Sequence, residues 1–203
     1  MSLPDNIGEI PIAKGHLFLL STPSVCSKCK EDTTAYCLAS TGYYDEDREF
    51  VRGFVTFSNL RLVSKNLYKF LVNHAPGYKP DYSKAAQERY FINHCSGCGA
   101  KKGDYYLHGE PGMGTFLPMS EEEARSITLE EVPFRSGEIF DADYGIASPS
   151  YIPFNARRIG EGTLEDKTYN EPPSRDERVG LKVFIAGLVT LSICALYLYA
   201  RGN

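Results

Sequence analysis

One strand-like stretch of the chain ends in a Cys-x-x-Cys-Gly turn: Tyr90-Phe91-Ile92-Asn93-His94-Cys95-Ser96-Gly97-Cys98-Gly99. A second Cys-x-x-Cys pair lies far upstream at Cys26-Ser27-Lys28-Cys29. Two such pairs supply the four thiolates of a tetrahedral structural site. We therefore predict that a single metal ion is held by Cys26, Cys29, Cys95 and Cys98. Zinc is the expected ion because it suits closed thiolate sites, and iron with the same ligands is the alternative.

Each cysteine pair is expected at the tip of a β-hairpin. Apolar, aromatic or β-branched runs flank the pairs at 16–20, 33–39, 89–93 and 105–108. Such composition is typical of strands. A tyrosine also lies seven positions after each pair, at Tyr36 and Tyr105. The two segments are therefore predicted to be one supersecondary unit used twice, as in zinc ribbons.

The two pairs are separated by 65 residues, more than the roughly 15–20 of a compact pair of Cys-x-x-Cys motifs. A helix over 59–73, capped by Ser58, is predicted to occupy part of this interval. Its apolar positions recur at the helical period: Leu60, Val63, Leu67, Phe70 and Leu71. The prolines and glycine of 75–80 would end it.

The chain beyond the second pair has weaker patterns. Ser120 and Glu123 have capping-box spacing and predict a short helix reaching about Ser126. The stretch 133–159 mixes aromatic residues with Gly and Pro, which favours irregular wrapping or edge strands. We therefore expect an α+β soluble domain over 1–159, with two zinc-knuckle hairpins, an inserted helix and an irregular C-terminal part.

The C-terminal region is predicted to be a membrane anchor. Val183 to Ala200 is a run of 18 residues without charge, just long enough as a helix to cross a bilayer core. A buried core helix is the alternative. We expect a flexible linker over 160–180 and a single transmembrane helix over 181–201. Basic residues are more frequent before the run than after it, and no signal peptide is visible, so the N-terminal domain is expected in the cytoplasm.

The number of cysteines in the chain favours metal ligation over disulfides. Cys194 lies in the apolar run, which leaves five cysteines elsewhere, four of them in pairs. An odd number of this kind indicates a reducing compartment. Cys37 is too far from the hairpin tip to be a first-choice ligand and is expected to be a buried thiol. His94 abuts Cys95 and is an alternative ligand, although an ordinary strand residue is the simpler interpretation.

The charge of the chain disfavours nucleic acid as a partner. The formal net charge is −4, and an acidic balance repels phosphate backbones. Four lysines flank the cysteine pairs: Lys28, Lys30, Lys101 and Lys102. They can offset the charge of the thiolates, or they can form a local basic patch that binds nucleic acid.

No residue pattern predicts catalysis or a cofactor other than the metal. Four cysteine ligands close the site, whereas a catalytic metal needs an open position for water. Should the protein be an enzyme, the first acid–base candidates are Asp104, His108 and Glu110. A thiol-dependent redox role would place a Cys-x-x-Cys pair at a helix start, and strand-like sequence follows both pairs here.

The second cysteine region also resembles a known family. The resemblance is carried by Asn93-His94-Cys95, Cys98-Gly99-Ala100, the run from Gly103 to His108, Glu110-Pro111 and Phe116. Over roughly Thr22 to Phe134, the chain resembles a family of largely uncharacterised bacterial proteins with paired Cys-x-x-Cys motifs. It departs at Ser27, where the family has an aromatic residue, and in its C-terminal anchor. The resemblance implies a zinc-binding module and no established activity.

Together these patterns predict a membrane-tethered zinc-binding domain that binds an unknown protein or small molecule. The metal would be structural. The alternatives are a metal-dependent or thiol-dependent enzyme and, less favoured, a nucleic-acid-binding zinc ribbon.

Overall fold

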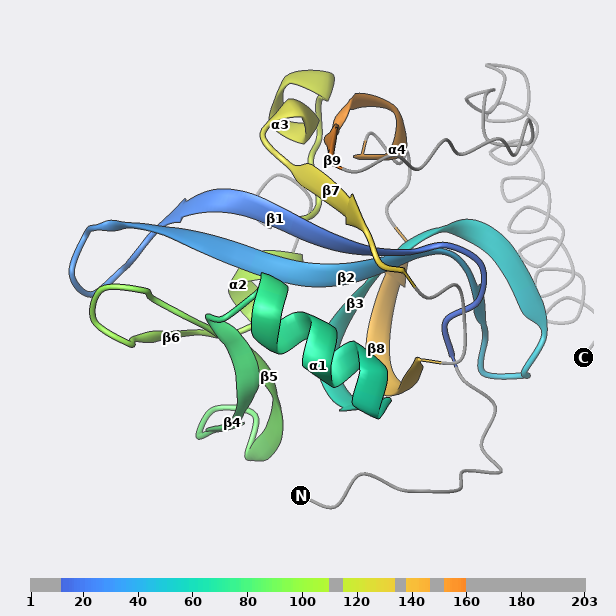
Figure 1. Cartoon of the computed structure of the whole chain (residues 1–203), viewed down its shortest axis with the longest axis horizontal. Helices are drawn as coiled ribbons and strands as arrows, with labels where there is room; N and C mark the ends of the chain where they lie inside the picture. Colours follow the sequence, from blue (N-terminus) through green and yellow to red (C-terminus); the bar gives the residue numbers. More distant parts are fainter. Residues whose placement is uncertain (1–11, 110–114, 134–137, 147–151, 160–203) are drawn as a thin grey trace, which may run out of the picture. The chain divides into compact units, whose positions relative to one another are not determined.

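A six-stranded sheet with the strand order β8-β3-β2-β1-β7-β9 organises the chain (Figure 1). The computed structural model describes residues 12–109, 115–133, 138–146 and 152–159. The strands of this sheet are β1 (Leu17–Val25), β2 (Asp32–Tyr44), β3 (Phe50–Val63), β7 (Thr128–Glu131), β8 (Ile139–Ile146) and β9 (Arg157–Ile159). A separate three-stranded sheet, β4-β5-β6, is formed by β4 (Tyr78–Ser83), β5 (Glu88–His94) and β6 (Lys101–Lys102).

Four helices complete the described residues: α1 (Lys65–His74), α2 (Tyr105–His108), α3 (Glu121–Arg125) and α4 (Ile152–Asn155). The cap of α1 is Ser64, whose hydroxyl accepts a hydrogen bond from the Leu67 N–H. The predicted helix after Ser120 is confirmed as α3, and the Ser120 side chain accepts a hydrogen bond from the Glu123 N–H. Both caps satisfy N–H groups that have no partner within the helix.

The hairpin of β1 and β2 is the most regular part of the large sheet. Its antiparallel register runs without interruption from Leu17 opposite Ser40 to Val25 opposite Asp32. Every residue of the runs 17–20 and 37–40 is buried. A strand covered on both faces has this pattern, in contrast to the alternating pattern of a strand with one face in water. The hairpin is therefore a central element that carries the first cysteine pair at its far end.

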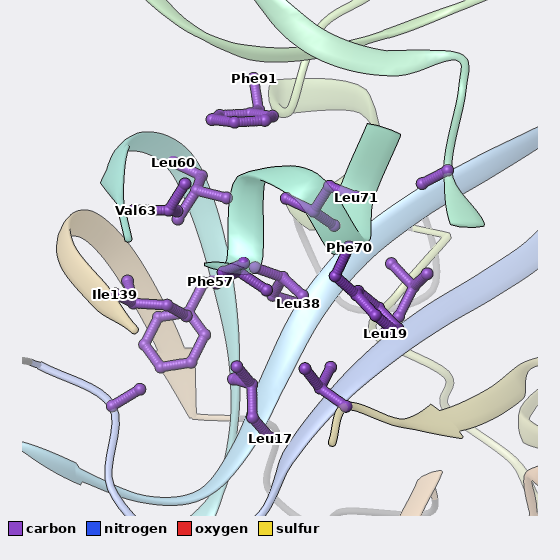
Figure 2. Close-up of a cluster of buried hydrophobic side chains, with 14 of the residues drawn as sticks. Leu17, Leu19, Leu38, Phe57, Leu60, Val63, Phe70, Leu71, Phe91 and Ile139 are labelled. Atoms are coloured by element: carbon purple, nitrogen blue, oxygen red, sulfur yellow. The ribbon is translucent and has the colours of Figure 1, made fainter. Parts of the chain in front are cut away.

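The main hydrophobic core lies between the large sheet and α1. Leu67, Phe70 and Leu71 form the buried face of α1. They belong to one cluster with residues from β1, β2, β3 and β5, among them Leu19, Leu38, Phe57, Leu60 and Phe91 (Figure 2). Because β4 and β5 contribute Tyr78 and Phe91 to the same cluster, the small sheet packs on the core of the large sheet.

The buried side chain of Asn93 also joins the two sheets. Its Oδ1 accepts a hydrogen bond from the Tyr36 N–H at 2.7 Å, and its Nδ2 donates to the Tyr36 carbonyl at 2.9 Å. The amide of Asn93 on β5 thus pairs with β2 as a neighbouring strand would. Only 3% of Asn93 is exposed, so its amide depends on these two bonds to satisfy its polar atoms.

The predicted fold class is wrong, because the chain forms a sheet-rich mixed structure around a six-stranded sheet and not two zinc-knuckle hairpins with an inserted helix. Residues 59–63, expected as the first turn of a helix, continue the 14-residue strand β3. Leu60 and Val63 are buried as strand residues, and the helix begins only after Ser64. The stretch 133–159 was expected to form irregular wrapping or edge strands, and the second alternative holds for β8 and β9, which lie at the two edges of the large sheet.

The second hairpin also differs from its expected form. The strand leading to Cys95 is present as β5, but β6 has only two residues. Tyr105 to His108, expected as the returning strand, form α2. The agreement in spacing between Tyr36 and Tyr105 therefore does not reflect a repeated hairpin.

The predicted membrane anchor is corrected as well. Within 12–109, 115–133, 138–146 and 152–159, none of the helices has the length and apolar character needed to cross a bilayer. The expected linker (160–180) and anchor (181–201) lie outside the described residues. The prediction of a single-pass, C-terminally anchored protein with a cytoplasmic domain is therefore not carried further. The boundary of the soluble domain at residue 159 stays a prediction.

Replacing Asn93 with alanine tests the link between the sheets. Asn93→Ala removes two hydrogen bonds and leaves the part-buried N–H and carbonyl of Tyr36 without these partners, so we expect the free energy of unfolding to fall by about 2–4 kcal/mol. Urea unfolding followed by circular dichroism measures this change. Asn66→Ala on the exposed side of α1 is the matched control and should change stability by less than about 0.5 kcal/mol. Equal effects of the two substitutions would contradict the bridging role of Asn93.

Candidate metal centre and adjoining cavity

The two Cys-x-x-Cys turns lie side by side, one between β1 and β2 and the other between β5 and β6 (Figure 1). The Sγ atoms of Cys26, Cys29, Cys95 and Cys98 all lie within 4.8 Å of one another. Two cross-turn pairs, Cys26 with Cys98 and Cys29 with Cys95, each have a sulfur–sulfur distance of 3.7 Å. The structure therefore brings together all four cysteines that the sequence predicted as ligands.

These distances fit a tetrahedral metal ion and exclude disulfides. With metal–sulfur bonds of about 2.3 Å, the sulfurs of a tetrahedral site lie about 3.8 Å apart. A disulfide would need about 2.05 Å, and all four cysteines are free thiols. The four donors are the thiolates that zinc and iron prefer.

Both turns have the same backbone geometry. The Lys30 N–H donates to the Cys26 carbonyl at 3.0 Å, and the Gly99 N–H donates to the Cys95 carbonyl at 2.9 Å. Lys30 and Gly99 occupy equivalent positions with φ of 65° and 68°. A left-handed residue at this point costs nothing for glycine but about 1 kcal/mol for lysine. The first turn adopts the left-handed conformation despite this cost. We attribute this to the need for both turns to direct their sulfurs to one centre.

The protonation of the four thiols is strongly unequal. Hydrogen bonds from the backbone N–H groups of Cys29 and Lys28 lower the pKa of Cys26 to about 6. The pKa of Cys95 is also lowered, chiefly by the Cys98 N–H. The Glu31 N–H acts to lower the pKa of Cys29, but burial and the neighbouring cysteine side chains together raise it to about 12. Four thiolates this close repel one another, so a cation is needed for all four to be ionised.

Contacts beside the cysteines hold the two turns in place. The Ser96 N–H in the second turn donates to Thr33 Oγ1 near the first turn at 3.3 Å. Lys102 donates to Ser24 Oγ on β1. Lys101 pairs with Asp81 at 2.8 Å and, with a smaller contribution from His94, lowers the pKa of Asp81. Lys101 and Lys102 thus make contacts within the protein.

His94 and Cys37, the other candidate ligands in the sequence, point elsewhere. His94 Nε2 contacts Asp81 Oδ2 at 3.0 Å, and His94 Nδ1 contacts the Ile92 carbonyl at 2.8 Å. Both ring nitrogens are therefore engaged away from the sulfurs. Cys37 is fully buried in β2, and burial is the main cause that raises its pKa well above the usual range. It is a core thiol, as the sequence indicated.

A cavity of about 850 Å³ is lined in part by residues that follow the second cysteine turn. Its lining includes Tyr82, Lys101, Asp104, Tyr106 and His108. A second cavity of about 460 Å³ is lined in part by Cys26 and Cys95, and it shares Lys101 and Tyr106 with the first. The second turn and the residues after it therefore form a wall common to the cavities and the metal centre.

Asp104 is a buried carboxyl group in the wall of the larger cavity. Its Oδ2 accepts the Asn59 N–H at 2.6 Å, whereas its Oδ1 has no hydrogen-bond partner among the described residues. Burial raises the pKa of Asp104 to about 7, and the charge of Asp143 adds to this. The sequence marked Asp104 as an acid–base candidate but did not reveal its partner. Asn59 was expected in a helix, and it adopts a left-handed conformation (φ 46°) at an irregularity of β3.

His108 is the second buried titratable group of this wall. Its Nε2 has no partner in the described part of the chain, and its ring packs against Phe116 with centroids 5.5 Å apart. Burial lowers its pKa to about 4, so the imidazole is neutral at pH 7. Glu110, the third acid–base candidate of the sequence, lies outside the described residues.

No family model matches the chain, and no curated protein or solved structure matches it either. The resemblance to a bacterial family therefore gains no support from these comparisons.

Replacing Asp104 with asparagine tests its raised pKa. A carboxyl whose pKa rises on folding stabilises the protein while it is protonated, and this stability is lost as pH rises through about 7. Between pH 5 and pH 8, the free energy of unfolding of the wild type should fall by about 2–3 kcal/mol relative to Asp104→Asn. Urea unfolding at several pH values, followed by circular dichroism, measures the difference. Parallel pH profiles of the two proteins would contradict the burial of an ionisable Asp104.

Proposed function

We propose that the protein is a binding module whose two sheets are cross-linked by one structural zinc ion on Cys26, Cys29, Cys95 and Cys98. One observation carries the proposal: four sulfurs from two turns distant in sequence lie within 4.8 Å of one another. Zinc is preferred to iron because it favours tetrahedral, closed thiolate sites. Iron stays the alternative ion.

A structural role follows from the number of ligands and from their positions. Four thiolates complete a tetrahedral coordination sphere and leave no position for water or substrate. The first pair terminates strands of the large sheet, and the second pair follows β5 of the small sheet. The ion would thus join two elements that otherwise meet through Asn93 and the shared hydrophobic core.

Binding is the activity best supported around this centre. Two cavities adjoin the second turn, and cavities of several hundred Å³ are typical of small-molecule sites. Nucleic-acid binding through Lys101 and Lys102 is disfavoured, because Lys101 is paired with Asp81 and Lys102 contacts Ser24. We therefore propose a small-molecule ligand.

Elemental analysis of the full chain, purified under reducing conditions, tests the zinc centre. We expect one zinc ion per chain. Cys95→Ser should lose the ion and unfold at a markedly lower temperature, because three thiolates bind the ion less tightly and folding is coupled to metal binding. Cys37→Ala is the matched control, since it removes a buried thiol outside the centre and should keep one zinc ion. A wild-type chain that is folded and free of metal, or a Cys95→Ser variant that keeps its zinc, would refute the proposal.

A further inference from the structure

We propose that the larger cavity binds a small, uncharged, planar heterocycle that carries an exocyclic amine, a ligand of the nucleobase class. Asp104 and His108 would contact the edge of the ring, and tyrosines would contact its face. This inference rests on the proposed binding function and names its ligand. It does not require the metal ion to touch the ligand.

Two buried, unpartnered polar atoms belong to residues that line the larger cavity, and a ligand with an N–H group can pair with them. Asp104 and His108 line the cavity, and Asp104 Oδ1 and His108 Nε2 are both buried without a partner among the described residues. A buried polar atom without a partner is energetically unfavourable, so a ligand that pairs with it gains affinity. An exocyclic amine supplies two N–H donors. Asp104 Oδ1 can accept one of them while Oδ2 keeps the Asn59 N–H.

The charge of the cavity favours a neutral ligand over a phosphate. The imidazole of His108 carries no charge at pH 7, because burial lowers its pKa to about 4. Asp104 can only add negative charge. Of the two lysines in the lining, Lys101 is already paired with the Asp81 carboxylate at 2.8 Å, and Lys84 is exposed. A phosphate group near Asp104 would be repelled by the carboxylate, and neither lysine is positioned to offset this repulsion.

Tyrosine rings favour a flat ligand. Tyr82, Tyr105 and Tyr106 line the cavity and are 41%, 83% and 67% exposed. Tyr105 and Tyr106 meet edge to face, with ring centroids 5.5 Å apart. Exposed aromatic rings beside a cavity offer surfaces on which a base can stack, and such stacking contributes to binding with little dependence on which base is bound. These three side chains are exposed and do not belong to the hydrophobic core.

The metal centre would hold one wall of this cavity in position. Only Gly99 to Gly103 separate Cys98 from Asp104, and Lys101 in this segment lines both cavities. On the opposite side, Asn59 ties Asp104 to β3. Asp104 is therefore fixed by two elements, as a specific binding site requires.

Isothermal titration calorimetry of the zinc-loaded full chain with adenosine tests the proposal. Adenosine should bind, and dimethyladenosine, whose amine has no N–H group, should bind at least about tenfold more weakly. Asp104→Asn should also weaken adenosine binding at least about tenfold. The Asn59 N–H requires the amide oxygen, so the amide nitrogen would face the ligand and could not accept its N–H.

Two further variants separate the cavity from the rest of the surface. Replacement of both Tyr105 and Tyr106 by alanine should weaken adenosine binding about tenfold. Tyr68→Ala, which removes a part-exposed tyrosine from α1 outside the cavity, is the matched control and should leave the affinity unchanged. Adenosine monophosphate should bind no more tightly than adenosine, because Lys101 in the lining of the cavity is already paired with Asp81.

Zinc content is measured for every variant, so that the two proposals fail separately. A zinc-loaded wild type that does not bind adenosine would overturn the nucleobase assignment and leave the metal centre intact. Binding that survives both Asp104→Asn and the double tyrosine replacement would also overturn it, because the ligand would then lie elsewhere. Wild-type chains without zinc would overturn the metal centre, whereas the response of adenosine binding to Asp104→Asn would still decide the cavity.

Discussion

The arrangement of the site depends on one electrostatic constraint: four cysteine sulfurs share a space too small for four unneutralised thiolates. Backbone N–H groups lower the pKa of Cys26 and Cys95, while the pKa of Cys29 is raised to about 12. A divalent cation removes this conflict, because all four sulfurs can then be ionised at once. The matching turns around Lys30 and Gly99 direct the sulfurs to a single point.

The constraint extends from the cysteines into the rest of the molecule. The two turns belong to different sheets, so an ion between them would add a third link to the Asn93 bridge and the hydrophobic core. The chain continues from Cys98 to Asp104 and contributes Lys101, Gly103 and Asp104 to the lining of the larger cavity. In this account the metal has no chemistry of its own and instead fixes the position of a buried carboxyl group.

The sequence predicted the cysteine cluster well because the paired Cys-x-x-Cys spacing reflects a local turn that tertiary contacts do not alter. It also located the β1–β2 hairpin and α3, whose signals are local. It failed for residues 59–63, where Leu60 and Val63 fit a helical period and are buried as strand residues. Pairing with distant β8 decided this segment, and single-sequence periodicity does not report such pairing. The Asn59–Asp104 contact depends on the same pairing and was missed for that reason.

X-ray absorption spectroscopy at the zinc edge of the purified protein tests the central claim most directly, since it counts the atoms bound to the ion. The account predicts four sulfur neighbours at about 2.3 Å and no nitrogen or oxygen neighbour in the first shell. A shell of three or fewer sulfurs completed by nitrogen or oxygen would contradict a closed four-cysteine centre. Such a result would show that the two turns leave a coordination position open.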